Sequence, residues 1–340
     1  MKVAGAARRA GLRGSAATIA RLAAAALAFA LAVPAQAFDL QGHRGTRGLE
    51  PENTLAAFRR ALEIGVDTLE MDAAITADGV VVISHDPELP PAITRDAQGR
   101  WLRARGPLIR SISFAELQTY DVGRIDPASD YARQFPEQTP RDGERRPSLR
   151  QVFDLVRSLH ADHVRFDIET KVFPDRPEAT LAPEPFARAL LDVIRAAGMT
   201  DRVMIQSFDW RTLTVVHALE PRMETVCLTA RTRGFDNLEG SAWTDGLPLS
   251  AVPSVPHLVK QAGCTTWAPY HGNLTREALG TAHELGLKAI PWTVNDPVDI
   301  DRLVGWGIDG IISDYPNRVR DVMARRSMPL PPRVAGAARP

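Results

Sequence analysis

The chain of 340 residues carries 41 basic and 41 acidic side chains, so its formal net charge is zero. Five of the basic residues lie before Ala37, and residues 38–340 therefore have 36 basic and 41 acidic side chains, a net charge of −5. This balance excludes the strongly basic surface that nucleic-acid-binding proteins need. A chain of about 300 residues can hold one α/β barrel or two ordinary domains.

Residues 1–37 have the pattern of an export signal. Basic residues come first, an apolar run at 22–33 follows, and Pro34-Ala35-Gln36-Ala37 offers small residues for cleavage after Ala37. The run is short for a membrane span, so we expect a cleaved signal peptide and a periplasmic or secreted protein without a stable membrane span. An uncleaved N-terminal anchor is the alternative. In an exported chain Cys227 and Cys264 could form a disulfide, or both could serve as small buried apolar residues.

Short apolar runs alternate with amphipathic helical stretches in the rest of the chain, as in a parallel sheet or barrel. Parallel strands are expected at 38–45, 67–76, 164–170, 203–208, 225–229, 265–269, 288–294 and 310–313. Helices are expected at 55–64, 148–159, 185–197, 211–219, 255–262, 276–285, 298–306 and 318–325. Eight parallel strands predict a TIM (β/α)8 barrel. A doubly wound sheet is the alternative, but the Gly-rich dinucleotide fingerprint is missing.

One connection departs from this alternation. Asp78-Gly79 is a turn signal between the second strand and a further strand at 80–85, and a two-residue turn joins only antiparallel strands. Residues 87–147, rich in Pro, Gly, Arg and Asp, are expected to form an inserted irregular subdomain with one short helix near 114–120. The Pro- and Arg-rich tail at 329–340 is expected to be disordered.

Polar residues at the ends of the strands are the candidates for chemistry, because the functional groups of TIM barrels gather there. Glu70 and Asp72 lie two residues apart on one strand, as do Glu169 and Lys171 on another, so each pair faces one side. Three carboxylates converging in a barrel mouth repel unless they are neutralised, and an all-oxygen set suits Ca²⁺ or Mg²⁺ better than zinc. Surface acids paired with Arg are the alternative, but these acids lie within apolar strands. Further polar or aromatic strand-end residues are His43, Arg44, Gln206, Tyr270, Trp292, Asn295 and Asp314.

The hairpin predicts where a second histidine lies. With Asp78 and Gly79 as the two turn residues, His85 is directly opposite Asp72, with Cβ atoms about 5 Å apart. The alternative is a histidine at a strand end that is simply bonded to Asp86.

Two histidines, a hard cation and two basic side chains meet the needs of phosphodiester hydrolysis. Of His43 and His85, one removes a proton from the nucleophile while the other protonates the departing alkoxide. The cation, Arg44 and Lys171 neutralise charge on the phosphate oxygens. No Ser or Cys nucleophile is required, and Gly-x-Ser-x-Gly is absent.

Several motifs, in their order along the chain, resemble those of the glycerophosphodiester phosphodiesterase family. The motifs are Gly42-His43-Arg44-Gly45, Pro51-Glu52-Asn53-Thr54, Glu70-Met71-Asp72, Asp78-Gly79, His85-Asp86, Ile168-Glu169-Thr170-Lys171, Trp292-Thr293-Val294-Asn295 and Asp309-Gly310-Ile311-Ile312-Ser313-Asp314. The resemblance implies a TIM barrel with an insertion after the hairpin. With its export signal and long insertion, the sequence also resembles the exported branch of this family, which releases sn-glycerol 3-phosphate and an alcohol.

The resemblance also implies roles for single residues. His43 and His85 would be the general acid and base, and Glu70, Asp72 and Glu169 would bind one Ca²⁺ or Mg²⁺. Arg44 and Lys171 would hold the phosphate, and Trp292 would form an apolar wall for the glycerol. The 2-hydroxyl of the glycerol would attack first, and water would then open the cyclic phosphate.

Two other functions fit the same sequence. One is lysophospholipase D-type hydrolysis of lysophospholipids, and the other is an exported protein that binds phosphodiesters without hydrolysing them.

Overall fold

The computed structural model describes residues 1–2, 5 and 38–335. The chain divides into two units, 1–37 and 38–340. Nearly all of the expected signal peptide, and residues 336–340 of the expected tail, therefore lie outside the described residues. Within the described ranges, no helix is both long and apolar enough to cross a membrane.

Eight parallel strands form the barrel, in the order β8-β7-β6-β5-β4-β2-β1-β9. Backbone hydrogen bonds from Asp309 N to Ala289 O (3.0 Å) and from Ile312 N to Pro291 O (3.1 Å) join the two ends of this order. The prediction of a TIM barrel is thus confirmed. Its strands are β1 (Asp39–Gly42), β2 (Thr68–Ile75), β4 (Arg165–Thr170), β5 (Val203–Ser207), β6 (Glu224–Thr229), β7 (Thr266–Pro269), β8 (Lys288–Ala289) and β9 (Gly310–Ser313).

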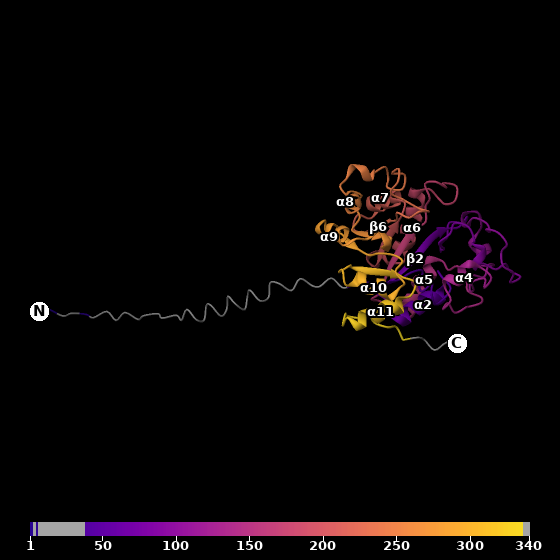
Figure 1. The fold of residues 1–340 in the computed structure, drawn as a ribbon, viewed down its shortest axis with the longest axis horizontal. Helices are drawn as coiled ribbons and strands as arrows, with labels where there is room; N and C mark the ends of the chain where they lie inside the picture. Colours follow the sequence, from indigo (N-terminus) through magenta and orange to yellow (C-terminus); the bar gives the residue numbers. More distant parts are fainter. Residues whose placement is uncertain (3–4, 6–37, 336–340) are drawn as a thin grey trace. The chain divides into compact units, whose positions relative to one another are not determined.

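Eight helices of the described chain follow these strands and pack on their outer side. They are α2 (Leu55–Ile64), α5 (Leu149–Ser158), α6 (Pro183–Ala196), α7 (Trp210–Leu219), α8 (Val255–Gln261), α9 (Arg276–Glu284), α10 (Pro297–Val304) and α11 (Pro316–Arg325). Neighbours in the sequence pack together, as α6 does with α7, α8 with α9 and α10 with α11 (Figure 1). The side chain of Thr54 caps the first turn of α2, and that of Ser148 caps the first turn of α5.

The hairpin differs from the expected one by a single residue. Strand β3 (Val81–Ile83) pairs with β2 so that Ile75 is opposite Val81, and Thr76 N donates to Val80 O. The loop therefore has three residues, and Gly79 at its end adopts a positive φ of 80°. Three-residue hairpin loops commonly end in such a left-handed glycine.

The prediction that His85 lies directly opposite Asp72 is therefore wrong. In the observed register Ser84 holds that place, and Ser84 N donates to Asp72 O at 2.8 Å. The physical reason is that Ala77 N donates to Ile112 O of the insertion at 2.8 Å and does not pair with Val80. Ala77 therefore joins the loop, and the side chain of Asp78 stabilises the loop by accepting hydrogen bonds from Thr76 Oγ1 (2.6 Å) and Phe114 N (3.0 Å).

Residues 87–147 form an irregular insertion between β3 and α5. It contains α3 (Phe114–Leu117), as expected, and also α4 (Asp130–Gln134), which was not expected because it buries no residue and so has no apolar period. Leu89, Ile109, Ile112 and Leu117 pack on Ala74 and Val82 of the hairpin. This second apolar cluster fixes the insertion beside the barrel mouth.

Three further findings concern the ends of elements. Strand β1 stops at Gly42 because the chain turns there, and a Cβ on Gly42 would come within 2.3 Å of Gly45 O. The expected strand at 288–294 has only two residues in regular pairing. Residues 329–335 of the tail are part of the described chain, and Val334 N donates to Leu62 O at 3.0 Å.

Cys227 and Cys264 form a disulfide, with a Cα–Cα separation of 5.9 Å. It joins β6 to the residue two positions before β7, so it ties two neighbouring strands of the barrel together.

Candidate active site

Three acids from two neighbouring strands meet in the barrel mouth. Asp72 on β2 is paired in register with Glu169 on β4, and Glu70 lies two residues before Asp72 on the same face. Single oxygens of the three carboxylates lie within 4.8 Å of one another, and all three side chains are buried. The structure thus brings together the acids proposed as metal ligands.

Neutral and basic groups surround these acids. Lys171 Nζ lies 2.7 Å from Glu169 Oε2 and 3.1 Å from Asp72 Oδ1. Burial raises the pKa of Glu70 well above its usual range and that of Glu169 to about 7. Burial also acts to raise the pKa of Asp72, but the charges of Lys171, His85 and Arg44 outweigh it and hold that pKa well below normal.

These residues fit a hard divalent cation. The donor set is all oxygen, and in the described part of the chain Lys171 Nζ is the one group that contacts the buried Asp72 Oδ1 as a salt-bridge partner. The raised pKa values of Glu70 and Glu169 indicate that added positive charge would be stabilised between them.

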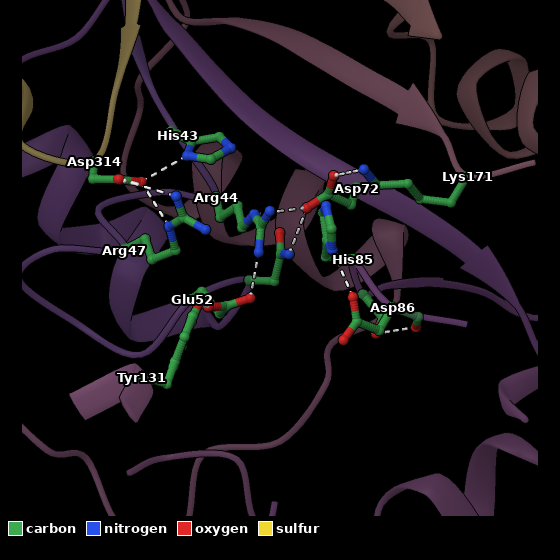
Figure 2. Close-up of polar contacts among 12 residues, drawn as sticks. His43, Arg44, Arg47, Glu52, Asp72, His85, Asp86, Tyr131, Lys171 and Asp314 are labelled. Carbon is green, nitrogen blue, oxygen red and sulfur yellow. Dashed lines mark hydrogen bonds and ion pairs between the residues drawn. The ribbon is translucent and has the colours of Figure 1, made fainter. Parts of the chain in front are cut away.

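His43, in the turn after β1, is held by a carboxylate. Its Nδ1 lies 2.6 Å from Asp314 Oδ1, and Arg47 Nε donates to the same oxygen at 2.8 Å (Figure 2). Burial, together with the charge of Arg47, lowers the pKa of His43 to about 4. A neutral ring that donates from Nδ1 has an accepting Nε2, and His43 Nε2 lies 3.9 Å from Glu70 Oε2. His43 is therefore arranged as a proton acceptor.

His85 is held in the same way by the residue that follows it. Its Nδ1 lies 2.7 Å from Asp86 Oδ1 (Figure 2). Burial and the charges of Arg44 and Lys171 lower its pKa. The one-residue change of register has not removed His85 from the site, since it lines the same cavity as His43. Its bond to Asp86 agrees with the alternative interpretation of the sequence, and His85 also lines the mouth.

Arg44 lies at the centre of the charged groups. Its backbone N donates to Glu70 Oε2 at 2.8 Å, its Nη1 donates to Glu52 Oε1 at 2.7 Å, and its Nε lies 3.3 Å from Asp72 Oδ2. Burial acts to lower its pKa, but Glu52 and Asp72 raise it well above normal. Arg44 has a positive φ of 50°, and such strain in a non-glycine residue persists only where the surroundings fix it. The guanidinium is thus a fixed cation in the mouth.

An aromatic wall lines one side of the mouth. Trp292 donates from Nε1 to Ala268 O at 2.9 Å, and its ring lies 5.3 Å from Phe208 and 5.8 Å from Tyr270. Further edge-to-face contacts continue from Phe208 through Phe235, Trp243 and Phe173. All of these rings are half-buried, and Trp292 and Phe208 offer an apolar surface to the mouth.

A cavity of about 210 Å³ collects seven of the eight predicted site residues. Asp72, which is not in the lining, contacts the lining residues Arg44 and Lys171. The lining residues are His43, Arg44, Arg47, Glu70, His85, Glu169, Lys171, Gln206, Phe208, Leu228, Trp292, Thr293 and Ile312. A larger cavity of about 860 Å³ between α8 and α9 is lined by no His or Lys, and its Arg231 is paired with Asp236. The smaller cavity is therefore the candidate active site.

The sequence reasoning missed some members of the site. Arg47, which binds Asp314 and lines the cavity, was not singled out, although it lies only three residues after Arg44. The sequence pattern indicates Asp314 only as a strand-end residue and Asp86 only as a partner of His85. No sequence signal shows that these two acids hold the two imidazoles in parallel ways.

The fold and the mouth together define a TIM-barrel enzyme. Residues 43–318 match the model of the glycerophosphoryl diester phosphodiesterase family. A glycerophosphodiester phosphodiesterase of Caldanaerobacter subterraneus is 26% identical over 285 residues, which cover 83% of this chain and 96% of that protein.

Two solved structures are also similar to this chain. A putative glycerophosphoryl diester phosphodiesterase of Silicibacter pomeroyi has a TM-score of 0.77 and 34% identity, over 86% of this chain and 95% of that one. An Oleispira antarctica phosphodiesterase, in complex with the product sn-glycerol-3-phosphate, has a TM-score of 0.62 and 22% identity over 84% of this chain and 96% of that one.

The chain belongs to the glycerophosphoryl diester phosphodiesterase family and is a hydrolase of phosphodiesters. This assignment replaces the alternative of a binding protein without activity.

Proposed function

We propose that this enzyme hydrolyses glycerophosphodiesters to sn-glycerol 3-phosphate and an alcohol, with His43 and His85 as the acid–base pair. The observation that carries the proposal is the pair of imidazoles in one cavity, each with Nδ1 bound to a carboxylate. The product in the Oleispira antarctica structure, sn-glycerol-3-phosphate, is consistent with it.

Each residue of the mouth has a defined task in this reaction. Glu70, Asp72 and Glu169 would hold one Ca²⁺ or Mg²⁺, which supplies positive charge to the phosphate oxygens and lowers the pKa of a bound hydroxyl. Arg44 and Lys171 bind the phosphate, and Trp292 packs against the carbons of the glycerol.

The reaction then takes two steps. One imidazole takes the proton of the glycerol 2-hydroxyl as its oxygen bonds to phosphorus, and the other protonates the oxygen of the departing alcohol as its bond to phosphorus breaks. Water opens the resulting cyclic phosphate with the two roles exchanged, and the ring oxygen leaves as the restored 2-hydroxyl.

Hydrolysis of glycerophosphocholine tests this proposal. We expect release of glycerol 3-phosphate with Ca²⁺ or Mg²⁺ and its loss in a chelator. His43→Ala and His85→Ala should each lower kcat by about 10²-fold or more, whereas the exposed His163→Ala should not. Full activity in either of the first two variants would contradict the assigned roles.

The aromatic wall supports a second candidate, the hydrolysis of lysophospholipids. The half-buried rings from Trp292 to Phe173 could cover an acyl chain that leaves the glycerol side of the mouth. Turnover of glycerophosphocholine and of lysophosphatidylcholine, compared below micelle-forming concentrations, separates the two. A higher kcat/KM for the lysolipid would favour this candidate.

We also propose that the mature enzyme is exported and begins at Phe38. The basic and apolar pattern of residues 1–37 supports this, as does the disulfide, since disulfides persist in oxidising compartments. N-terminal sequencing of the protein from the extracytoplasmic fraction should begin at Phe38. Recovery only from the cytosol, with Met1 retained, would contradict export.

A further inference from the structure

A second cavity of about 230 Å³ lies beside the first. Arg44, Arg47 and His85 line both cavities, so the two meet at two guanidinium groups and one imidazole. The other residues of the second cavity are Glu52, Asp86, Pro90, Ala92, Ile93 and Tyr131. Four of these six belong to the insertion at 87–147, and the reaction described above assigns no role to this insertion.

The shape of the substrate matches this pair of cavities. In a phosphodiester the phosphorus lies between two alcohol oxygens, and the anionic centre must lie beside the cations that both cavities share. The apolar wall of Trp292 and Phe208 lines only the first cavity. With the glycerol against that wall, the other alcohol is directed into the second cavity.

The chemistry of the second cavity suits a small alcohol that can donate a hydrogen bond. Both oxygens of Glu52 are already used, by Arg44 and by the hydroxyl of Tyr131. Asp86 Oδ1 is used by His85, but within the described part of the chain Asp86 Oδ2 accepts no hydrogen bond, and its side chain is 32% exposed. Pro90, Ala92 and Ile93 supply apolar walls for carbon atoms.

We propose that the insertion forms the subsite for the leaving alcohol, and that this subsite takes a small alcohol with a hydroxyl or ammonium group facing Asp86. The inference rests on the proposed function. Each cavity is smaller than the roughly 300 Å³ at which pockets for drug-sized ligands begin, so each holds a group of a few heavy atoms. Ile93, only 6% exposed, forms part of the wall and limits the size of the alcohol.

The subsite also distinguishes the two histidines. His43 lines only the first cavity, whereas His85 lines both. His43 is therefore the base that takes the proton of the glycerol 2-hydroxyl, and His85 is the acid that protonates the departing oxygen.

Variants of Ile93 test the subsite with three substrates: the methyl, ethanolamine and inositol esters of sn-glycerol 3-phosphate. Ile93→Trp fills the cavity, so the ratio of kcat/KM for the inositol ester to that for the methyl ester should fall about tenfold or more. Ile93→Ala enlarges the cavity, so the same ratio should rise. Inhibition by free sn-glycerol 3-phosphate should change less than this ratio, because the product occupies the first cavity.

Ala115→Trp is the matched control, since Ala115 is an exposed residue of α3 in the same insertion and lines neither cavity. It should leave the ratio at the wild-type value. A ratio that is the same in all Ile93 variants would overturn the subsite. If Ile93→Trp does not fold, as judged by circular dichroism, Ile93→Ala alone decides. Failure of the wild type on all three esters would instead overturn the proposed function.

Discussion

His43 and His85 are bound alike at Nδ1 but differ in how deeply they lie. The side chain of His43 is 11% exposed and that of His85 is 36% exposed. The better-exposed imidazole is the one at the junction of the two cavities, where a departing group must receive its proton. The negative charge of a bound phosphodiester would favour the protonated form of His85.

A substrate with an acidic leaving group separates the roles of the two histidines. For the p-nitrophenyl ester of sn-glycerol 3-phosphate, the departing phenolate needs no proton. His85→Ala should therefore lose far less kcat on this ester than on glycerophosphoethanolamine, whereas His43→Ala should lose a similar factor on both. Steady-state kinetics with the two esters checks this. Equal losses in His85→Ala would assign it another role.

The buried His43 also makes stability depend on pH. Its pKa is about 4 in the folded chain and about 6.5 when unfolded, so the unfolded state binds more protons between these values. Its contribution to stability is complete above pH 6.5 and is lost as the pH falls toward 4.

Urea denaturation of wild type and His43→Asn at pH 7 and pH 5 measures this effect. The wild type should lose about 2 kcal/mol more of its free energy of unfolding than the variant does. Parallel losses in both proteins would contradict a neutral, buried His43.

Residues of the site were predictable where a strand fixes their direction. The placement of Glu70, Asp72 and Glu169 followed from strand ends alone, because alternate residues of a strand face one side. The role of Arg47 did not, because it depends on how the turn after β1 is folded. Four residues beyond His43, its guanidinium reaches Asp314 at the end of the neighbouring strand β9.

At the scale of elements, the β2–β3 hairpin shows why a one-residue difference in strand register is hard to predict from the sequence. Asp78-Gly79 fits a two-residue turn and also the last two residues of a three-residue loop. Tertiary contacts with the insertion decide between them: Ala77 N donates to Ile112 O, and Phe114 N donates to Asp78 Oδ1. The order of strands and helices needed no such contacts, since it follows from hydrophobic period alone.

Two glycine substitutions should change the free energy of unfolding in opposite directions. Gly79 has a φ of 80° in the hairpin loop, so Gly79→Ala should lower the free energy of unfolding by about 1 kcal/mol. Gly280 lies in the exposed part of α9 with no atom near its Cβ position, so Gly280→Ala should raise it by up to about 1 kcal/mol. Chemical denaturation measures both. A stabilising Gly79→Ala would contradict the observed loop.

At the scale of the whole molecule, the acids at the mouth should link stability to metal. Ca²⁺ or Mg²⁺ should raise the Tm, because the ion would bind the folded state and not the unfolded one. The rise should be larger at pH 8 than at pH 6, since the pKa of Glu169 is about 7 and a metal ligand must be deprotonated.

Thermal melts with and without the ion check this at both pH values. Glu169→Gln should lose most of the rise, whereas Glu284→Gln, at an exposed position on α9, should keep it. An undiminished rise in Glu169→Gln would place the ion elsewhere.

We expect the junction between β8 and β9 to open more easily than other pairs of strands in the barrel. Strand β8 has two paired residues, and Pro291 has no N–H to donate, so backbone bonds from Asp309, Ile312 and Val294 carry most of this junction. Local unfolding starts where such bonds are few, and we expect these amides to exchange with deuterium earlier than those between β2 and β4. Because Trp292 lies beside this junction, the barrel would open first at the wall proposed for the glycerol.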